Sequence, residues 1–501
     1  MTGSTYVAYL LGLAVSILIA RRLGPADFGR YSYLVWLSGL LVVVSNHGLT
    51  TSGIRFISES VGRGSPDAAR NIHGHLRRWQ FASIGLVTVV FLIALPWLRP
   101  AGWESRLWLF ALIVVASTAA KSVFLFDISI AKGYGRFGVE AVCTVAVSIA
   151  NALAVLVLVA LGASLIAFLG LFVVASLAYA FIAATMLRAV APSPQRAPLE
   201  ATLLARVKQH LVWTMVLVVV GALSNKSIET LLLNATTGPA EVGYFAIAAA
   251  LTRGGVEMLS SGLSTVLMPA MAHAYGAGGA QRVSPILSDA VRYTQFFGLL
   301  LAGVGVLWAG VAVNLLYGPR FEPVVDVFRV MVVVGGITLA DGAFGALLTT
   351  TDHQPLRAGI AVFSVLVSAV CAFALVPRYG LSGAIAAHAT SRLIVFSLVV
   401  AGIVKSLAVR LPWRELGRLV GSAALAATVV ALWWWMVPGP VGQAIAGFAY
   451  ALIFVTASIA LRAWQAQDIA MLGTLAKRFP AIDRRLRPML ERWQAGLRPR
   501  T

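Results

Sequence analysis

Residues 24–29 of the chain read Gly-Pro-Ala-Asp-Phe-Gly, and residues 238–243 read Gly-Pro-Ala-Glu-Val-Gly. The second copy follows the first by 214 residues, and the same offset carries the dipeptide Gly-Leu at 48–49 onto the same dipeptide at 262–263. Self-similarity at one fixed offset is the signature of a repeated architecture. The sequence therefore predicts two halves built on one plan.

Long apolar runs surround both copies of this motif. A helix that crosses the ~30 Å hydrocarbon core of a bilayer needs about 20 mostly apolar residues. Fourteen such runs occur, at approximately 2–20, 32–53, 80–98, 107–129, 139–161, 164–187, 210–233, 243–268, 293–316, 325–350, 358–376, 381–404, 417–437 and 441–461. Of the 501 residues, 59% are hydrophobic and only 12% are charged, whereas soluble domains are about 25% charged. This composition excludes a soluble enzyme, a disulfide-rich secreted domain and a disordered chain.

The fourteen runs predict an all-α polytopic membrane protein with two parallel six-helix lobes plus a C-terminal helical hairpin. Six spans in each half is an even number, so both halves insert in the same direction. The predicted parts are an N-terminal lobe at 1–190, a cytoplasmic linker at 191–209, a C-terminal lobe at 210–410, the extra hairpin at 411–464 and a basic amphipathic cytoplasmic tail at 465–501.

The basic residues predict the orientation. The chain has 39 Lys and Arg against 19 Asp and Glu, a formal net charge of +20. Cytoplasmic loops of membrane proteins carry an excess of Lys and Arg, and 27 of these residues fall in one alternating set of loops against 7 in the other. Both termini are therefore predicted to be cytoplasmic. Because Arg21 and Arg22 follow the uncharged residues 1–20, the reverse of a secretory signal, the first span is expected to be retained.

Sequence motifs of the common enzyme classes are missing. The P-loop pattern, HExxH, CxxC, GxSxG and Asp-x-Asp do not occur, and each of these fixes a nucleophile, metal ligands or a phosphate-binding backbone at a set spacing. We therefore expect a protein that is not an enzyme and uses no cofactor or metal. Cys143 and Cys371 lie inside apolar runs and are expected to be small packing residues.

Ionisable residues inside the apolar runs are the main functional candidates. Each costs at least ~2.5–3.5 kcal/mol at the bilayer centre, so it should face a partner or a water-filled cavity. The candidate cavity cations are Arg253, Lys226, Arg392 and Lys121, and the candidate ion-coupling carboxylates are Glu257, Asp341 and Asp127. Helical spacing puts Arg253 with Glu257, Lys226 with Glu229, and Arg55 with Glu59 on common faces. There are more Lys and Arg than are needed to pair one-to-one with the carboxylates, which suits an anionic substrate. The alternative is that these residues form ion pairs that only hold the helix bundle together.

The sequence after residue 464 is basic and amphipathic. Apolar residues recur every three or four positions from Leu472 to Leu497, with arginines between them. This pattern is typical of a helix on an anionic membrane surface. The alternative is a solvated tail interrupted by Pro480 and Pro488.

Two segments narrow the class of membrane protein. ARRLGPADFGRYSYL (20–34) and NHGLTTSGIRFISES (46–60) resemble the start of the Wzx-like O-antigen and polysaccharide flippases. That family belongs to the multidrug/oligosaccharidyl-lipid/polysaccharide (MOP) exporter superfamily, which has the same fourteen-helix plan. RGGVEMLSSGLSTVLMPAMA (253–272) is similar to the eighth span of the bacterial lipid II flippases, where an arginine faces the cavity. The resemblance implies that Arg253, and with it Arg55, Arg21 and Arg22, binds the substrate diphosphate.

The resemblance implies a flippase that moves an undecaprenyl-diphosphate-linked oligosaccharide across the bacterial cytoplasmic (inner) membrane. The product would feed synthesis of a polysaccharide such as O-antigen, capsule or exopolysaccharide. Expected partners are this polyprenyl-diphosphate-linked oligosaccharide and membrane lipids, with a polysaccharide polymerase and a chain-length regulator as candidates, and no nucleic acid.

Two other functions stay open. A cation-coupled multidrug antiporter of the same superfamily commonly uses a carboxylate in its first helix, and residues 1–20 contain none. A polysaccharide polymerase or ligase typically needs a large external loop that carries catalytic residues, and the predicted external loops are short.

The orientation predicts a labelling pattern. In a variant that lacks Cys143 and Cys371, a cysteine introduced by Ser193→Cys should be protected from a membrane-impermeant thiol reagent in intact cells and should react after permeabilisation. Labelling of this cysteine in intact cells would reverse the predicted orientation.

Overall fold

The computed structural model describes residues 2–195, 197–224, 227–351, 354–407, 409–436, 439–465 and 468. Within these residues all regular elements are helices and no β-strand occurs. Lys226 and the tail after 468 lie outside the described residues. The predicted all-α fold is confirmed.

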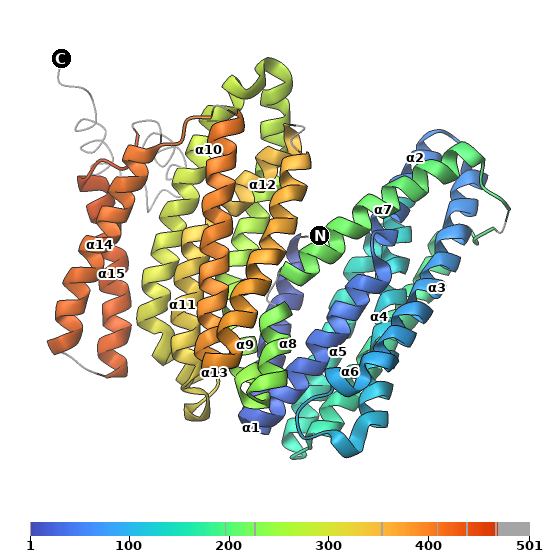
Figure 1. The fold of residues 1–501 in the computed structure, drawn as a ribbon, viewed down its shortest axis with the longest axis horizontal. Coiled ribbons are helices and arrows are strands. Elements are labelled where there is room, and N and C mark those ends of the chain that lie inside the picture. The colour runs from blue at the N-terminus through green and yellow to red at the C-terminus, as the bar shows by residue number, and fades with distance from the viewer. Residues whose placement is uncertain are drawn as a thin grey trace, which may run out of the picture. The chain divides into compact units, whose positions relative to one another are not determined.

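Fifteen α-helices make up the described part of the chain (Figure 1). They are α1 (Thr2–Asn46), α2 (Leu49–Gly62), α3 (Pro66–Leu98), α4 (Leu107–Gly133), α5 (Gly138–Ala160), α6 (Leu165–Val190), α7 (Ala201–Ser224), α8 (Ser227–Thr236), α9 (Pro239–Thr252), α10 (Met258–Leu316), α11 (Val324–Ile337), α12 (Asp341–Thr350), α13 (Gln354–Leu407), α14 (Trp413–Met436) and α15 (Pro440–Ala460).

Eleven helical stretches in the described ranges are long and apolar enough to cross a membrane. Three of them, of 41, 78 and 52 residues, are far longer than one crossing. Each of the three is interrupted by glycine with a non-helical backbone: α1 at Gly24, α10 at Gly278 and Gly279, and α13 at Gly380. Division at these glycines gives the fourteen crossings that the sequence predicts.

The repeated motif forms a helix start, and this corrects the predicted second span. Gly24 and Gly238 have φ values of 75° and 136°, which glycine adopts at little steric cost. The prolines that follow suit the first turn of a helix, because their φ is fixed and their missing N–H is not needed there. The helix after Gly24 therefore begins at Pro25, about two turns before the predicted start at residue 32.

Close contacts divide the chain into two compact units. Unit 1 comprises Met1–Ala250, Leu316–Val324 and Ala358–Ser391, and unit 2 comprises Leu251–Leu315, Val325–Arg357 and Arg392–Thr501. The six-helix lobes predicted at 1–190 and 210–410 describe a repeat in the way the chain inserts into the membrane. Their boundaries stay a prediction.

Helix α4 is central to unit 1, where it packs against α1, α2, α3 and α6 (Figure 1). Phe126 and Ile130 of α4 are fully buried. Close to the end of the helix, a methyl group on Gly133 would lie 2.9 Å from the carbonyl oxygen of Gly53. Small residues at such crossings let two helix backbones approach closely, which is a main source of helix association inside a bilayer.

Loops that the sequence places on the same side of the membrane contact each other in unit 1. On the predicted external side, the Asn234 amide donates to the Arg99 carbonyl at 3.0 Å. On the predicted cytoplasmic side, the Gln195 backbone N–H donates to the Arg70 carbonyl at 3.1 Å, which fastens the proline-rich linker to α3. The alternation of the spans in unit 1 agrees with these contacts, and the assignment of one side to the cytoplasm stays a prediction.

The two copies of the motif meet within unit 1 in a reciprocal contact. A methyl group on Gly29 would collide with the carbonyl oxygen of Pro239, and one on Gly243 would lie 2.9 Å from the carbonyl oxygen of Pro25. The two contacts are related by the same offset of 214 residues that relates the motifs. Equivalent residues of the two halves therefore face each other, and only glycine fits at the last position of each motif.

Gly29→Ala should destabilise the protein by roughly 1–3 kcal/mol, because the new methyl group overpacks the crossing of the helices that begin at Pro25 and Pro239. The matched control is Gly39→Ala on the same helix, where an added methyl group meets no atom within 4 Å. Thermal unfolding of the purified protein in detergent should show a lower midpoint for Gly29→Ala and an unchanged or higher one for Gly39→Ala. Equal midpoints for the two variants would contradict the close crossing.

Candidate functional site

Lys121 lies near the middle of α4, in unit 1. Its ammonium nitrogen is 4.3 Å from the centre of the Phe172 ring, a cation–π contact that stabilises by roughly 0.5–2 kcal/mol. Among the described residues it forms no ion pair with a carboxylate. Because an aromatic ring balances a full positive charge only in part, Lys121 can attract an anion.

Asp127 is a buried member of a polar network in unit 1. Its side chain is 1% exposed and accepts a hydrogen bond from Arg77, which is 50 positions away in sequence. Arg77 also donates to Gln80 at 3.0 Å, and Gln80 donates to the Ser122 carbonyl at 2.9 Å. The network joins α3 to α4 and gives the carboxylate a structural partner. A role for Asp127 in ion coupling stays a prediction.

Arg21 and Arg22 bind the ends of other helices in unit 1. Arg21 Nε donates to the carbonyl of Leu316 at 2.7 Å, and Arg22 donates to the carbonyl of Gly162, which follows α5. Carbonyl groups at the C-terminal end of a helix carry partial negative charge and favour a cation. Both side chains remain exposed. Their role in diphosphate binding therefore stays a prediction.

Arg55 lies on α2 beside α7, with its Nη1 atom 3.1 Å from Nδ1 of His210. The expected partner Glu59 instead accepts hydrogen bonds from Arg206 of α7 at 2.9 and 3.2 Å and pairs with Arg63 at 2.6 Å. The pKa of Glu59 is lowered, first because Arg206 donates to the carboxylate and also because of the nearby positive charges. Glu59 therefore pairs with Arg206 of α7 and with Arg63 at the end of its own helix rather than with Arg55, and Arg55 is exposed.

Arg253 occupies a distinctive backbone position in unit 2. Residues Arg253–Glu257 form one π-helical turn between α9 and α10, and such turns are rare and frequent at functional sites. Val256 packs this turn closely against Gly335. A methyl group added to Gly335 would lie 3.1 Å from the Val256 side chain. The side chain of Arg253 is exposed, whereas that of Val256 is buried. The backbone of Glu257 belongs to this turn, and its role stays a prediction.

Asp341 and Arg392, which are separate candidates in the sequence, form a pair in unit 2. The Arg392 Nη2 atom is 3.6 Å from Asp341 Oδ2, and the two side chains are 44% and 33% exposed. Asp341 begins α12 directly after a 3₁₀ turn, Thr338–Ala340, whose Leu339 carbonyl accepts a hydrogen bond from Ser260 at 3.1 Å. The pair is therefore held by ordered backbone and is still open to a ligand.

Glu229 is a buried carboxylate for which the sequence suggests only a pair with Lys226. It lies on α8 in unit 1 and is 1% exposed. The Ser368 hydroxyl donates to Glu229 Oε1 at 3.2 Å. The sequence marks Glu229 as unusual because it is a glutamate inside the apolar run 228–233. Its contact with Ser368 depends on the packing of helices that are far apart in sequence.

The described residues contain no group of three or more His, Cys, Asp and Glu that could hold a metal ion. The candidates in unit 1 are Lys121, Arg21, Arg22, Arg55 and Asp127, and those in unit 2 are Arg253, Asp341, Arg392 and Glu257. Cations predominate in unit 1, whereas the candidates of unit 2 are two arginines and two carboxylates. Several of these side chains are exposed within or next to membrane-spanning helices.

The fold is similar to that of solved membrane transporters and flippases. It is similar to the lipid II flippase MurJ in an inward closed conformation (12% identity, TM-score 0.69, covering 91% of this chain and 97% of that chain). It is also similar to an inward-facing multidrug resistance MATE family transporter of the MOP superfamily (14% identity, TM-score 0.67, covering 80% of this chain and 95% of that chain). Such low identities show the fold alone. Among curated proteins, none matches the chain.

Residues 1–274, more than half of the chain, match the family described as "Polysaccharide biosynthesis protein". The chain belongs to this family. It is a multi-pass membrane protein, and the predicted relation to proteins of polysaccharide biosynthesis is confirmed.

The buried pair and the exposed pair should respond differently to substitution. Arg77→Met leaves Asp127 buried without its partner, which should destabilise the protein by roughly 3–5 kcal/mol. Arg77→Met combined with Asp127→Leu should recover most of this loss. Denaturant unfolding in detergent measures both effects, and failure of the double variant to recover would show that the unpaired charge of Asp127 is not the cause of the loss.

Asp341→Asn should change the free energy of unfolding by no more than about 1 kcal/mol, because partly exposed ion pairs contribute little. Transport in cells should nevertheless fall if this carboxylate takes part in coupling. Normal transport by a stable Asp341→Asn variant would remove Asp341 from the functional candidates.

Proposed function

We propose that the protein is a flippase that moves a polyprenyl-diphosphate-linked oligosaccharide across the bacterial cytoplasmic membrane for polysaccharide biosynthesis. Membership of the polysaccharide biosynthesis family supports a role in this process. The position of Arg253 supports a diphosphate-containing substrate. This arginine is exposed on a π-helical turn within a long apolar stretch. A guanidinium group matches the oxygens of a diphosphate in a bidentate geometry.

The proposed cycle divides the substrate between two environments. Cationic side chains bind the diphosphate, the sugars follow a hydrophilic path, and the lipid tail stays in the bilayer. Both termini are taken to be cytoplasmic, as the basic residues predict. The sequence contains no P-loop, so the work would come from an ion gradient, with Asp341, Glu257 and Asp127 as candidate coupling carboxylates, or from consumption of the product.

A cation-coupled multidrug antiporter is the second candidate, because the MATE transporter shares the fold. A route for a cationic drug should expose carboxylates, which attract the positive charge. The exposed candidate site residues in this protein are mainly arginines. The absence of a carboxylate in residues 1–20 also weighs against this function.

Deletion of the gene should cause lipid-linked oligosaccharide to accumulate on the cytoplasmic face of the membrane and should abolish the surface polymer. Sensitivity to cationic dyes should be unchanged, since drug export is not the function. Extraction of lipid-linked sugars and staining for surface polysaccharide test this expectation. Normal polymer with increased dye sensitivity would favour the antiporter.

Arg253→Ala should lower transport roughly 10–100-fold while the protein accumulates normally, because hydrogen bonds to a charged group contribute about 1.5–3 kcal/mol. Arg253→Lys keeps the charge but loses the bidentate fork, so its transport should be intermediate. The matched control Arg378→Ala, which removes an exposed arginine at a predicted external loop, should leave transport unchanged.

The double variant Arg253→Ala with Glu257→Ala separates substrate binding from a structural ion pair. It should remain inactive if Arg253 binds the diphosphate. Recovery of transport in the double variant would instead show that Arg253 only balances the charge of Glu257.

A further inference from the structure

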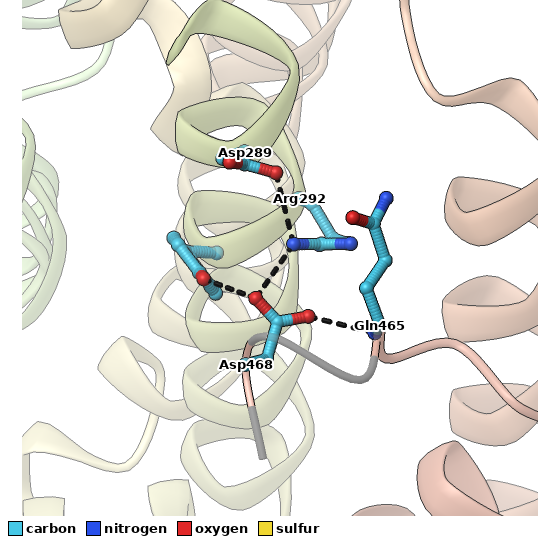
Figure 2. Close-up of polar contacts among 5 residues, drawn as sticks. Asp289, Arg292, Gln465 and Asp468 are labelled. Carbon is cyan, nitrogen blue, oxygen red and sulfur yellow. Dashed lines mark hydrogen bonds and ion pairs between the residues drawn. The ribbon is translucent and has the colours of Figure 1, made fainter. Parts of the chain in front are cut away.

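Arginine side chains in this protein differ in how fully their charge is neutralised. Arg292 of α10 is only 1% exposed, and its Nη2 atom lies 2.8 Å from Asp468 Oδ1 and 2.9 Å from Asp289 Oδ1, as Figure 2 shows. Arg55 of α2 is exposed, and in the described part of the chain it forms no ion pair with a carboxylate. The charge of Arg55 is therefore available to an anion from outside the chain.

The surroundings of Arg55 hold its side chain without neutralising it. The guanidinium carbon lies 5.2 Å from the centre of the buried Phe56 ring, a cation–π contact. The Nη1 atom lies 3.1 Å from Nδ1 of His210 on α7. The His210 ring also packs on Phe56, with the ring centres 5.6 Å apart and the planes at 80°. Arg55, Phe56 and His210 thus form one packed group between α2 and α7 in unit 1.

The contact between Arg55 and His210 defines where the histidine carries its proton. Arginine has donors only, so Nδ1 of His210 accepts the hydrogen bond and carries no proton. In the neutral ring the proton is then on Nε2, which lies 3.4 Å from the Thr214 hydroxyl oxygen. That hydroxyl donates to the His210 carbonyl at 2.7 Å. Thr214, His210 and Arg55 therefore form a chain of hydrogen bonds in which each group orients the next.

Thr214 is itself held at the break between α1 and α2. Gly48 at this break has a φ of 89°, and a methyl group added to it would lie 2.8 Å from Cβ of Thr214. The Thr214 side chain therefore packs directly on the backbone at Gly48. The chain of hydrogen bonds that ends at Arg55 begins at a closely packed position.

We propose that His210, oriented by Thr214, is a positioning residue for Arg55, and that Arg55 held in this way binds a phosphate of the transported diphosphate. The bond to Nδ1 uses one of the guanidinium donors, and the others remain for phosphate oxygens. A side chain that is ordered before binding loses less entropy when the ligand arrives. The inference rests on the proposed function, because the diphosphate is the anion which that function names.

The test measures binding of geranylgeranyl diphosphate to the full chain in detergent by isothermal titration calorimetry. Arg55→Ala should weaken binding roughly 10–100-fold, because hydrogen bonds to a charged group are lost. His210→Phe keeps an aromatic ring against Phe56 but removes the acceptor, and should weaken binding roughly 3–10-fold. His210→Asn can place its amide oxygen where Nδ1 lies, and should bind the probe as the unchanged protein does.

A double-variant cycle shows whether His210 acts through Arg55. In the Arg55→Ala background, His210→Phe should cause no further loss, because the group that it positions is gone. The matched control is His75→Phe, which replaces another half-buried histidine of unit 1, packed on Trp79, and should leave binding unchanged. Independent losses in the cycle, or equal losses in His210→Phe and His210→Asn, would overturn the role of His210.

A second variant covers the possibility that His210→Phe does not accumulate. Thr214→Val removes the hydroxyl that orients the imidazole and should weaken binding about twofold to threefold. Unchanged binding in Thr214→Val would then overturn the proposal. Displacement of the probe by excess phosphatidylglycerol from the unchanged protein, but not from Arg55→Ala, would assign the arginine to a lipid headgroup and would also overturn it.

The proposed function and this inference fail in different ways. Weaker binding in Arg253→Ala with normal binding in Arg55→Ala would overturn the inference and leave the proposed function standing. Absence of any binding of geranylgeranyl diphosphate to the unchanged protein would contradict the proposed function, and the inference with it.

Discussion

The exclusion of water from the bilayer core is the constraint on which this structure depends. Backbone N–H and C=O groups in that region must be satisfied within the chain, and helices achieve this locally. The same constraint governs side chains, since an ionised group in hydrocarbon is costly unless it has a partner. Buried charges in the described residues accordingly occur in networks, as with Arg77 and Asp127 or Arg292 and Asp468.

Close approach of helices supplies much of the remaining stability. Lipid tails are as apolar as the side chains, so association depends on packing rather than on burial from water. The reciprocal fit of Gly29 and Gly243 within unit 1 is an example, and it joins equivalent residues of the two repeated motifs. If the two helices that carry these glycines moved apart, this contact would be lost. Any such movement would therefore cost part of the protein's stability.

The polar residues fall into two groups by exposure, and exposure separates structural from functional candidates. Asp127 and Arg292 are almost fully buried. Asp127 pairs with Arg77, and Arg292 pairs with Asp289 and Asp468, so these partners neutralise their charge. Arg392 and Asp341 keep a third or more of their side-chain surface exposed. Arg253 is exposed on an irregular turn. Charges that the fold leaves accessible in an apolar protein are the ones that a ligand can reach.

The sequence by itself determined the fold class, the fourteen crossings and the internal repeat. Apolar length and the 1.5 Å rise per residue of a helix are local properties, and a bilayer of fixed thickness converts them directly into spans. The second span begins earlier than the sequence predicts, because the left-handed φ of Gly24 ends the first helix and Pro25 starts the next one directly, without a loop.

Only the tertiary structure decided which charges meet. Asp341 pairs with Arg392, Glu59 pairs with Arg206 instead of Arg55, and Asp127 pairs with a residue 50 positions away. Helical periodicity identifies the residues that share a face of one helix. It contains no information about which faces of separate helices pack together, because that depends on side-chain shapes along whole crossings. The candidates could therefore be named from the sequence, but their partners could not.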